Sequence, residues 1–137
     1  MKKTVLATAF LAGLTATQAL AEDPLGREEY MTACAGCHGE SGKGDGPLAG
    51  LLNIQTPSLT TIAGTKGDGE FPMEWVVWMI DGRNIIRAHG AEMPVWGDRY
   101  LASAEVSEAE SETPESEELV VRGRILSLAY YLESIQE

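Results

Sequence analysis

The stretch Cys34-Ala35-Gly36-Cys37-His38 constrains this chain more than any other feature of its sequence. Two thiols three residues apart lie on one turn of backbone, so both can form thioether bonds to the two vinyl groups of a single porphyrin. The imidazole that follows then lies beneath the ring, where it can ligate the iron. This C-x-x-C-H spacing is typical of covalent c-type haem attachment. Because the chain has only these two cysteines, no thiol is left over.

Three other interpretations of the motif remain open. A thioredoxin-like dithiol would need a βαβ pattern around the cysteines, and the surrounding sequence has none. A disulfide between Cys34 and Cys37 would close a very small loop and leave His38 unexplained. A zinc site would need a second pair of ligands, whereas His89 is the one other histidine and no further cysteine exists. The sequence therefore favours haem.

The first 21 residues have the pattern of a secretory signal peptide. Two lysines follow the initial methionine, an apolar run covers 5–14, and Ala19-Leu20-Ala21 is a small-x-small cleavage site. The apolar run is too short to span a membrane. An uncleaved N-terminal anchor is the alternative. We expect residues 1–21 to be removed and residues 22–137 to form one domain.

The mature chain is strongly acidic. Without the two lysines of the signal peptide, eight basic residues face 21 acidic ones, which gives a net charge of −13. No basic patch exists to displace phosphate counterions, so nucleic acid is disfavoured as a partner. A partner protein with a basic docking surface is favoured, although the charge could also serve solubility alone. Residues 103–118 hold seven acids and no base, which predicts a solvated, mobile insertion at about 103–116.

Turn formers and proline positions predict three main helices. The first runs from about Pro24 to Ala35, the second from about Pro72 to Asp81, and the last from about Pro114 to Ile135. Residues 39–69 are rich in glycine and proline, so they predict a long, mostly irregular segment. Its apolar residues are expected to line a haem pocket: Leu48, Leu51, Leu52, Ile54 and Leu59.

One face of the first predicted helix carries Gly26, Tyr30 and Cys34, each four residues from the next. Glycine is costly inside a helix. A close crossing with another helix at Gly26 would justify it, and the apolar stripe of the last predicted helix is the candidate partner.

Met93 is the candidate for the second face of the iron. It precedes Pro94, which pushes it into an extended conformation outside any helix and suits a thioether that hangs from a loop. A histidine and methionine pair is associated with electron-transfer cytochromes and a raised potential. His89 is the rival ligand, and Met73, an open site or simple packing of Met93 are the other possibilities. Methionines within predicted helices are expected to fill space in the core: Met31, Met73 and Met79.

The mature chain resembles a bacterial class I cytochrome c over nearly all of 24–137, apart from the acidic insertion. The spacing of Gly26 and Tyr30 before the C-x-x-C-H motif and the pair Met93-Pro94 carry this resemblance. It implies an all-α fold, in which three main helices and long loops wrap around one covalent haem c.

The resemblance also implies roles for individual residues. Cys34 and Cys37 would form the thioethers, and His38 and Met93 would ligate the iron. The stretch 42–47 is similar to the loop that follows the haem histidine in this family. That similarity implies that the Pro47 carbonyl accepts a hydrogen bond from the His38 imidazole, with Pro57 as the competing acceptor. In addition, Arg83 and Trp96 are expected to contact haem propionates.

The function that the resemblance implies is single-electron transfer by a periplasmic protein whose iron cycles between Fe(III) and Fe(II). Such a protein is a carrier in a respiratory or related electron-transfer chain and not itself an enzyme. Its partners would be redox proteins, and it would meet a membrane only through a partner complex. The alternatives are a haem-based sensor or small-ligand binder, the haem subunit of a larger oxidoreductase, and a thiol-disulfide protein without haem.

Overall fold

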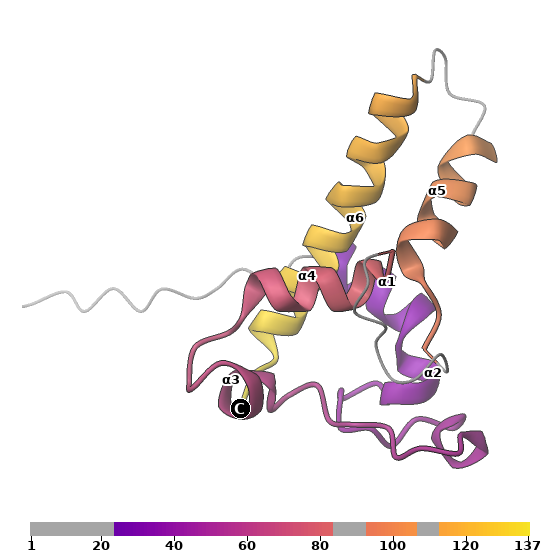
Figure 1. Cartoon of the computed structure of the whole chain (residues 1–137). Coiled ribbons are helices and arrows are strands. Elements are labelled where there is room, and N and C mark those ends of the chain that lie inside the picture. Colours follow the sequence, from indigo (N-terminus) through magenta and orange to yellow (C-terminus); the bar gives the residue numbers. More distant parts are fainter. Residues whose placement is uncertain (1–23, 84–92, 107–112) are drawn as a thin grey trace, which may run out of the picture.

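The computed structural model describes residues 24–83, 93–106 and 113–137, and this part of the chain is helical and contains no strand (Figure 1). The predicted signal peptide, His89 and the middle of the predicted acidic insertion lie outside the described residues. None of the helices in these three ranges is long and apolar enough to cross a membrane.

The three predicted helices are confirmed. The first is α1 (Pro24–Ala33), which is followed after one residue by the short helix α2 (Ala35–His38). The second is α4 (Met73–Asp81), and the third is α6 (Pro114–Ser134). Thr113 caps α6 as expected, because its hydroxyl accepts from the Ser116 amide while the Ser116 hydroxyl accepts from the Thr113 amide.

Two helices and a 3₁₀ turn were not predicted. The turn Ala49–Leu51 and the helix α3 (Ile62–Lys66) interrupt the segment expected to be irregular. Helix α5 (Trp96–Val106) extends into the predicted acidic insertion, so residues 103–106 are helical. The buried Tyr100 explains α5, since it anchors that helix in the core. The density of acidic residues concealed this packing at the level of the sequence.

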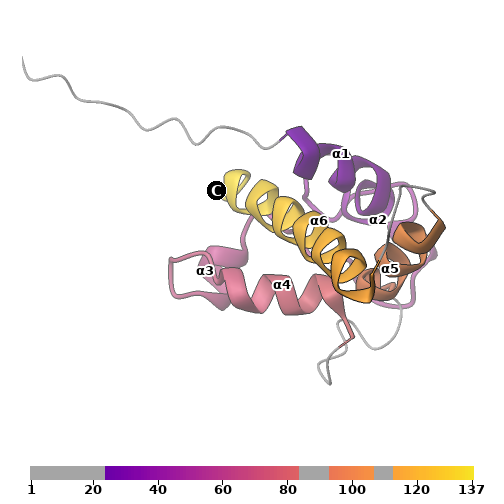
Figure 2. The ribbon, with the colours of Figure 1, turned by 90° about the horizontal axis from the view of Figure 1, so that it is seen from above.

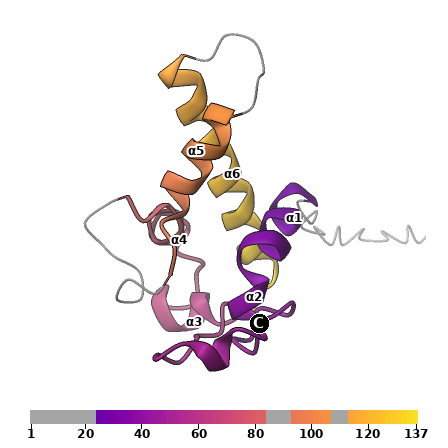
Figure 3. The ribbon, with the colours of Figure 1, turned by 90° about the vertical axis from the view of Figure 1, so that its right-hand side faces the viewer.

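Helix α6 is the centre of the fold. Figure 2 shows α6 between α1 on one side and α4 on the other. Helix α5 packs along the N-terminal part of α6, and α2 and α3 lie at the opposite end of the molecule (Figure 3). The inward face of α6 is buried as its stripe predicted, with these residues in the core: Val121, Ile125, Leu128, Ala129, Tyr131 and Leu132.

The predicted close crossing at Gly26 is confirmed. A Cβ atom at Gly26 would collide with the backbone carbonyl of Ser127 and lie 2.9 Å from the Cβ of Tyr131. One turn further along α1, the rings of Tyr30 and Tyr131 pack with centroids 5.1 Å apart. Because α1 ends where the haem motif begins, this crossing fixes the position of Cys34 relative to the core.

Candidate functional site

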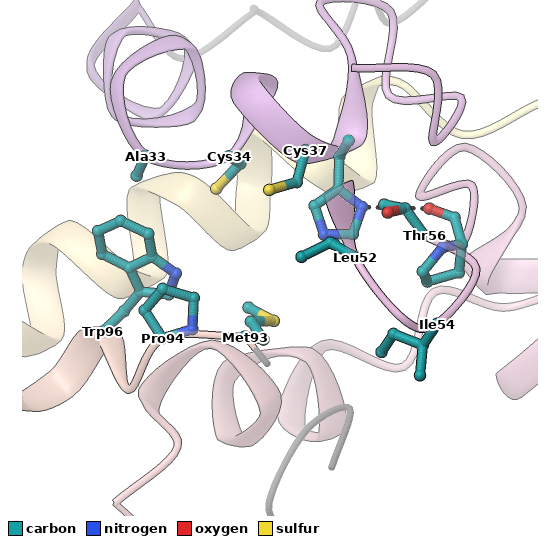
Figure 4. A pocket seen from close by; sticks show the side chains of 11 residues that line it. Ala33, Cys34, Cys37, Leu52, Ile54, Thr56, Met93, Pro94 and Trp96 are labelled. Carbon is teal, nitrogen blue, oxygen red and sulfur yellow. Dashed lines mark hydrogen bonds between the residues drawn. The ribbon is translucent and has the colours of Figure 1, made fainter. Parts of the chain in front are cut away.

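The C-x-x-C-H motif is folded as a continuation of α1. The Cys34 amide donates to the Tyr30 carbonyl at 2.8 Å, and the His38 amide donates to the Cys34 carbonyl at 2.9 Å. This helical turn projects the sulfurs of Cys34 and Cys37 into the same space (Figure 4). The motif therefore has the arrangement that attachment of one planar group through both thiols requires.

The glycine-rich loop after the motif packs against α2. Backbone amides of Gly44, Gly46 and Leu48 donate to carbonyls of α2 at 2.7, 3.1 and 2.9 Å, which satisfies acceptors at the end of that helix. Gly44 has a φ of +81°, and a side chain at Gly46 would run into the backbone of α2. The glycines thus allow the loop to approach the haem motif closely.

The His38 ring is oriented by Pro57 rather than by Pro47. Its Nδ1 donates to the Pro57 carbonyl at 3.1 Å, so Nε2 lies on the opposite side of the ring, and His38 lines the adjoining cavity. The prediction of Pro47 as acceptor is wrong, and the competing acceptor is correct. The physical reason is that the loop preceding residue 48 is held against α2, whereas residues 56–57 return to the imidazole and pack against Gly44.

A cavity of about 420 Å³ adjoins the motif, and Cys34, His38, Met93 and Trp96 all line it. A smaller hollow beside it is lined by the same four residues and by Cys37. Met93 lies outside any helix, as its proline neighbour predicted, and it enters the space from the side opposite the two cysteines (Figure 4). Residues far apart in the sequence are thereby brought to one site.

The predicted apolar lining is correct in part. Leu52 and Ile54 line the smaller hollow and Leu59 lines the larger cavity. Leu48 and Leu51 instead have exposed fractions of 48% and 79%, so the prediction is wrong for these two residues. The 3₁₀ turn at 49–51 carries Leu51 outward, which periodicity in a glycine-rich segment could not reveal.

Among the described residues, Arg83 is not part of the lining of either cavity, and its contact with a haem propionate stays a prediction. Its guanidinium donates to both carboxylate oxygens of Asp81 at 2.6 and 2.8 Å and to both of Glu118 at 2.7 and 3.1 Å. These bonds lower the pKa of the Asp81 carboxyl, and with help from Arg122 they hold the pKa of Glu118 at about 2. The guanidinium is therefore engaged within the protein. Trp96 does line the cavity, and its contact with a propionate stays a prediction.

Two residues at the site were missed by the sequence analysis. Met79, expected to fill space, lines the larger cavity from α4. Thr56 lines the smaller hollow, and its buried hydroxyl has no hydrogen-bond partner among the residues that the structure describes. The sequence signalled only a turn at Thr56-Pro57, and nothing in the helical pattern distinguished Met79 from the other helical methionines.

The environment of the thiols disfavours a thiol-disulfide protein. No disulfide joins Cys34 and Cys37, and burial raises the pKa of the Cys34 thiol to about 12, with a smaller contribution from the negative charge of Glu29. Reactive dithiols need a lowered pKa, because the thiolate is the nucleophile. The surroundings of Cys34 instead raise the pKa of its thiol.

The comparison with protein families decides the identity of the chain. A family model described as cytochrome c matches residues 25–108. The chain belongs to the cytochrome c family. No curated protein and no solved structure matches it. Membership identifies the cofactor as a covalent c-type haem with iron, the general role as electron transfer, and the helical fold as that of a class I cytochrome c.

The residues of the cavity fit such a haem. Two thiols that could bond the porphyrin share one space with an imidazole and a thioether, which are donors suited to haem iron. The remaining lining is predominantly apolar, as a porphyrin face requires, with Leu52, Ile54 and Pro94 among its members. The buried hydroxyl of Thr56 supplies a hydrogen-bond donor that a bound carboxylate could satisfy.

Proposed function

We propose that this cytochrome carries single electrons in the periplasm, as a member of a respiratory or related electron-transfer chain. In this proposal Cys34 and Cys37 would hold the haem covalently, and His38 and Met93 would ligate its iron. The observation that carries it is that His38 and Met93, from distant parts of the chain, line the same cavity as the thiols.

The residues of the site have distinct tasks. The Pro57 carbonyl holds the His38 ring in one tautomer and orientation, which makes the imidazole a better donor. The apolar lining excludes water and lowers the local dielectric, and this favours the reduced state with less charge. His38 and Met93 would both ligate the haem iron, so no substrate would need to bind it. When bound, the haem supplies the one-electron couple between ferric and ferrous iron.

The partner that we propose is a redox protein with a basic docking surface. The net charge of the whole chain is −11, and loss of the two signal-peptide lysines makes it −13. Opposite charges on a partner accelerate association by steering the encounter, and the rate then falls as salt is added. Contact with a membrane would occur only through such a partner complex.

Substitution of the two cavity methionines tests the axial ligand. Met93→Ala should abolish the weak long-wavelength absorption of sulfur-ligated ferric haem and lower the midpoint potential. Met79→Ala is the matched control, because Met79 lines the same cavity from α4 and should leave both properties almost unchanged. If Met79→Ala abolishes the absorption and lowers the potential while Met93→Ala does not, Met79 is the ligand. If neither variant changes the absorption or the potential, the assignment moves to His89.

Carbon monoxide provides the second measurement. The reduced native protein should not bind it at neutral pH, because Met93 occupies the position where it would bind. Ready binding, together with a high-spin spectrum, would favour a haem-based sensor over an electron carrier. Expression with haem-attachment machinery also tests export, since the haem-loaded protein should appear in the periplasm and begin after Ala21.

A further inference from the structure

A network of charged side chains lies where the two ends of the chain segment that carries Met93 come close together. We propose that Arg83, together with Asp81 and Glu118, is a positioning device that holds Met93 in place as the sulfur ligand. The inference rests on the proposed function, because it takes Met93 to be that ligand. It assigns Arg83 a task that the sequence analysis did not predict.

The backbone on either side of Met93 is drawn against the end of α4. Gly82 adopts a φ of +67°, and a Cβ atom there would lie 3.4 Å from the Cα of Val95. A Cβ atom at Gly97 would collide with Asp81 Oδ1 and Arg83 Nε. Residues 81–83 and 95–97 are therefore in direct contact, and Met93 lies only two residues from that contact.

The Arg83 guanidinium ties this junction to the core. It bonds to Asp81 at the end of α4 and to Glu118 on the second turn of α6, with both oxygens of each carboxylate engaged. The exposed fractions of the Arg83 and Asp81 side chains are 24% and 16%. Bidentate, partly buried pairs of this kind hold a fixed geometry better than single surface ion pairs.

A second bidentate ion pair also involves α6. Arg124 donates to the two carboxylate oxygens of Glu29 at 2.7 and 3.1 Å and so ties α6 to α1. The same guanidinium donates to the Ser103 hydroxyl at 2.8 Å and lies 4.1 Å from the centre of the Tyr100 ring, so it also contacts α5. This pair stabilises the helix crossing and does not involve residues 81–83 or 95–97. Arg124 is therefore the matched control for Arg83, because each guanidinium forms a bidentate ion pair that includes one residue of α6.

Competition by imidazole measures how firmly Met93 is held. Imidazole can bind the ferric iron only in molecules whose Met93 has left it, so its apparent affinity is proportional to the population of that open state. In the full, haem-loaded chain, Arg83→Ala should raise the apparent affinity for imidazole about tenfold, which corresponds to about 1.4 kcal/mol. Arg124→Ala should lower the urea midpoint but leave the imidazole affinity within about twofold of wild type.

The same substitutions in a Met93→Ala background show whether Arg83 changes imidazole binding through Met93 or by another route. With no sulfur to compete, Arg83→Ala should no longer change the imidazole affinity. A persistent change there, or an equal change in Arg124→Ala, would overturn the proposal. Glu118→Gln provides a second variant if Arg83→Ala fails to load haem, and it should raise the affinity by a smaller factor. An unchanged affinity in this variant also counts against the proposal.

The outcomes distinguish the two proposals. If Met93→Ala alone strengthens imidazole binding and removes the long-wavelength absorption, whereas Arg83→Ala and Glu118→Gln do neither, the axial ligand stands and the positioning device is refuted. If Met93→Ala leaves the spectrum unchanged, the ligand assignment is wrong and the inference fails with it.

Discussion

Gly26 offers the sharpest test of how the haem motif is positioned. At the crossing of α1 and α6, the space for a methyl group is already filled by the Ser127 carbonyl and the Tyr131 Cβ. Neither atom is the end of a flexible side chain, so Gly26→Ala requires the two helices to move apart. Gly123, in the middle of α6, is the matched control because no atom of the described residues lies within 4 Å of the position its Cβ would occupy.

We expect Gly26→Ala and Gly123→Ala to change the free energy of unfolding in opposite directions. Alanine is favoured over glycine in a helix by about 1 kcal/mol, and both substitutions gain this amount. Overpacking a tight contact costs about 1–3 kcal/mol, and Gly26→Ala alone incurs that cost. Because backbone atoms are involved, we take the upper part of that range. Gly26→Ala should therefore destabilise the fold by about 1–2 kcal/mol, while Gly123→Ala should stabilise it by up to about 1 kcal/mol.

Urea unfolding of the haem-loaded protein, followed by circular dichroism at 222 nm, measures both free energies of unfolding. A second readout is expected for Gly26→Ala alone, because α1 leads directly into the motif: the haem absorption should change as the thiols are displaced. If Gly26→Ala were as stabilising as Gly123→Ala, the reasoning from the close crossing would be refuted.

Three further predictions concern hydrogen bonds and ion pairs that support the site. Tyr30→Phe removes the buried bond of 2.6 Å to the Gly39 carbonyl and should lower the free energy of unfolding by about 1–2 kcal/mol in a urea titration, whereas an unchanged value would show that this bond is dispensable. Gln136→Ala removes bonds to three backbone groups and should cost about 2 kcal/mol, with Gln136→Glu intermediate because it keeps only the acceptor. The pKa of Glu118 is lowered from 4.5 to about 2 by Arg83 and by a second arginine, so its contribution to stability is complete above about pH 4.5 and is lost as the pH falls toward 2. Glu118→Gln should flatten the pH dependence of the urea midpoint in that window, and an identical profile would contradict the ion-pair argument.

The local parts of this protein could be predicted from its sequence alone. The C-x-x-C-H spacing indicated the kind of cofactor, since it depends only on one turn of backbone. Proline and capping residues marked the starts of α4 and α6, because such signals act within a few residues. The spacing of Gly26, Tyr30 and Cys34 even predicted a close helix crossing, since a glycine is costly inside a helix unless another element approaches it.

The tertiary structure decided which distant groups meet. Pro57 and not Pro47 accepts the His38 hydrogen bond, because the glycine-rich loop is held against α2 and the chain returns to the imidazole only at residues 56–57. The Arg83 guanidinium donates to the carboxylates of both Asp81 and Glu118, because α6 brings Glu118 beside the end of α4. Neither result depends on local spacing. Both depend on the packing around α6, which is built from contacts between residues widely separated in the chain.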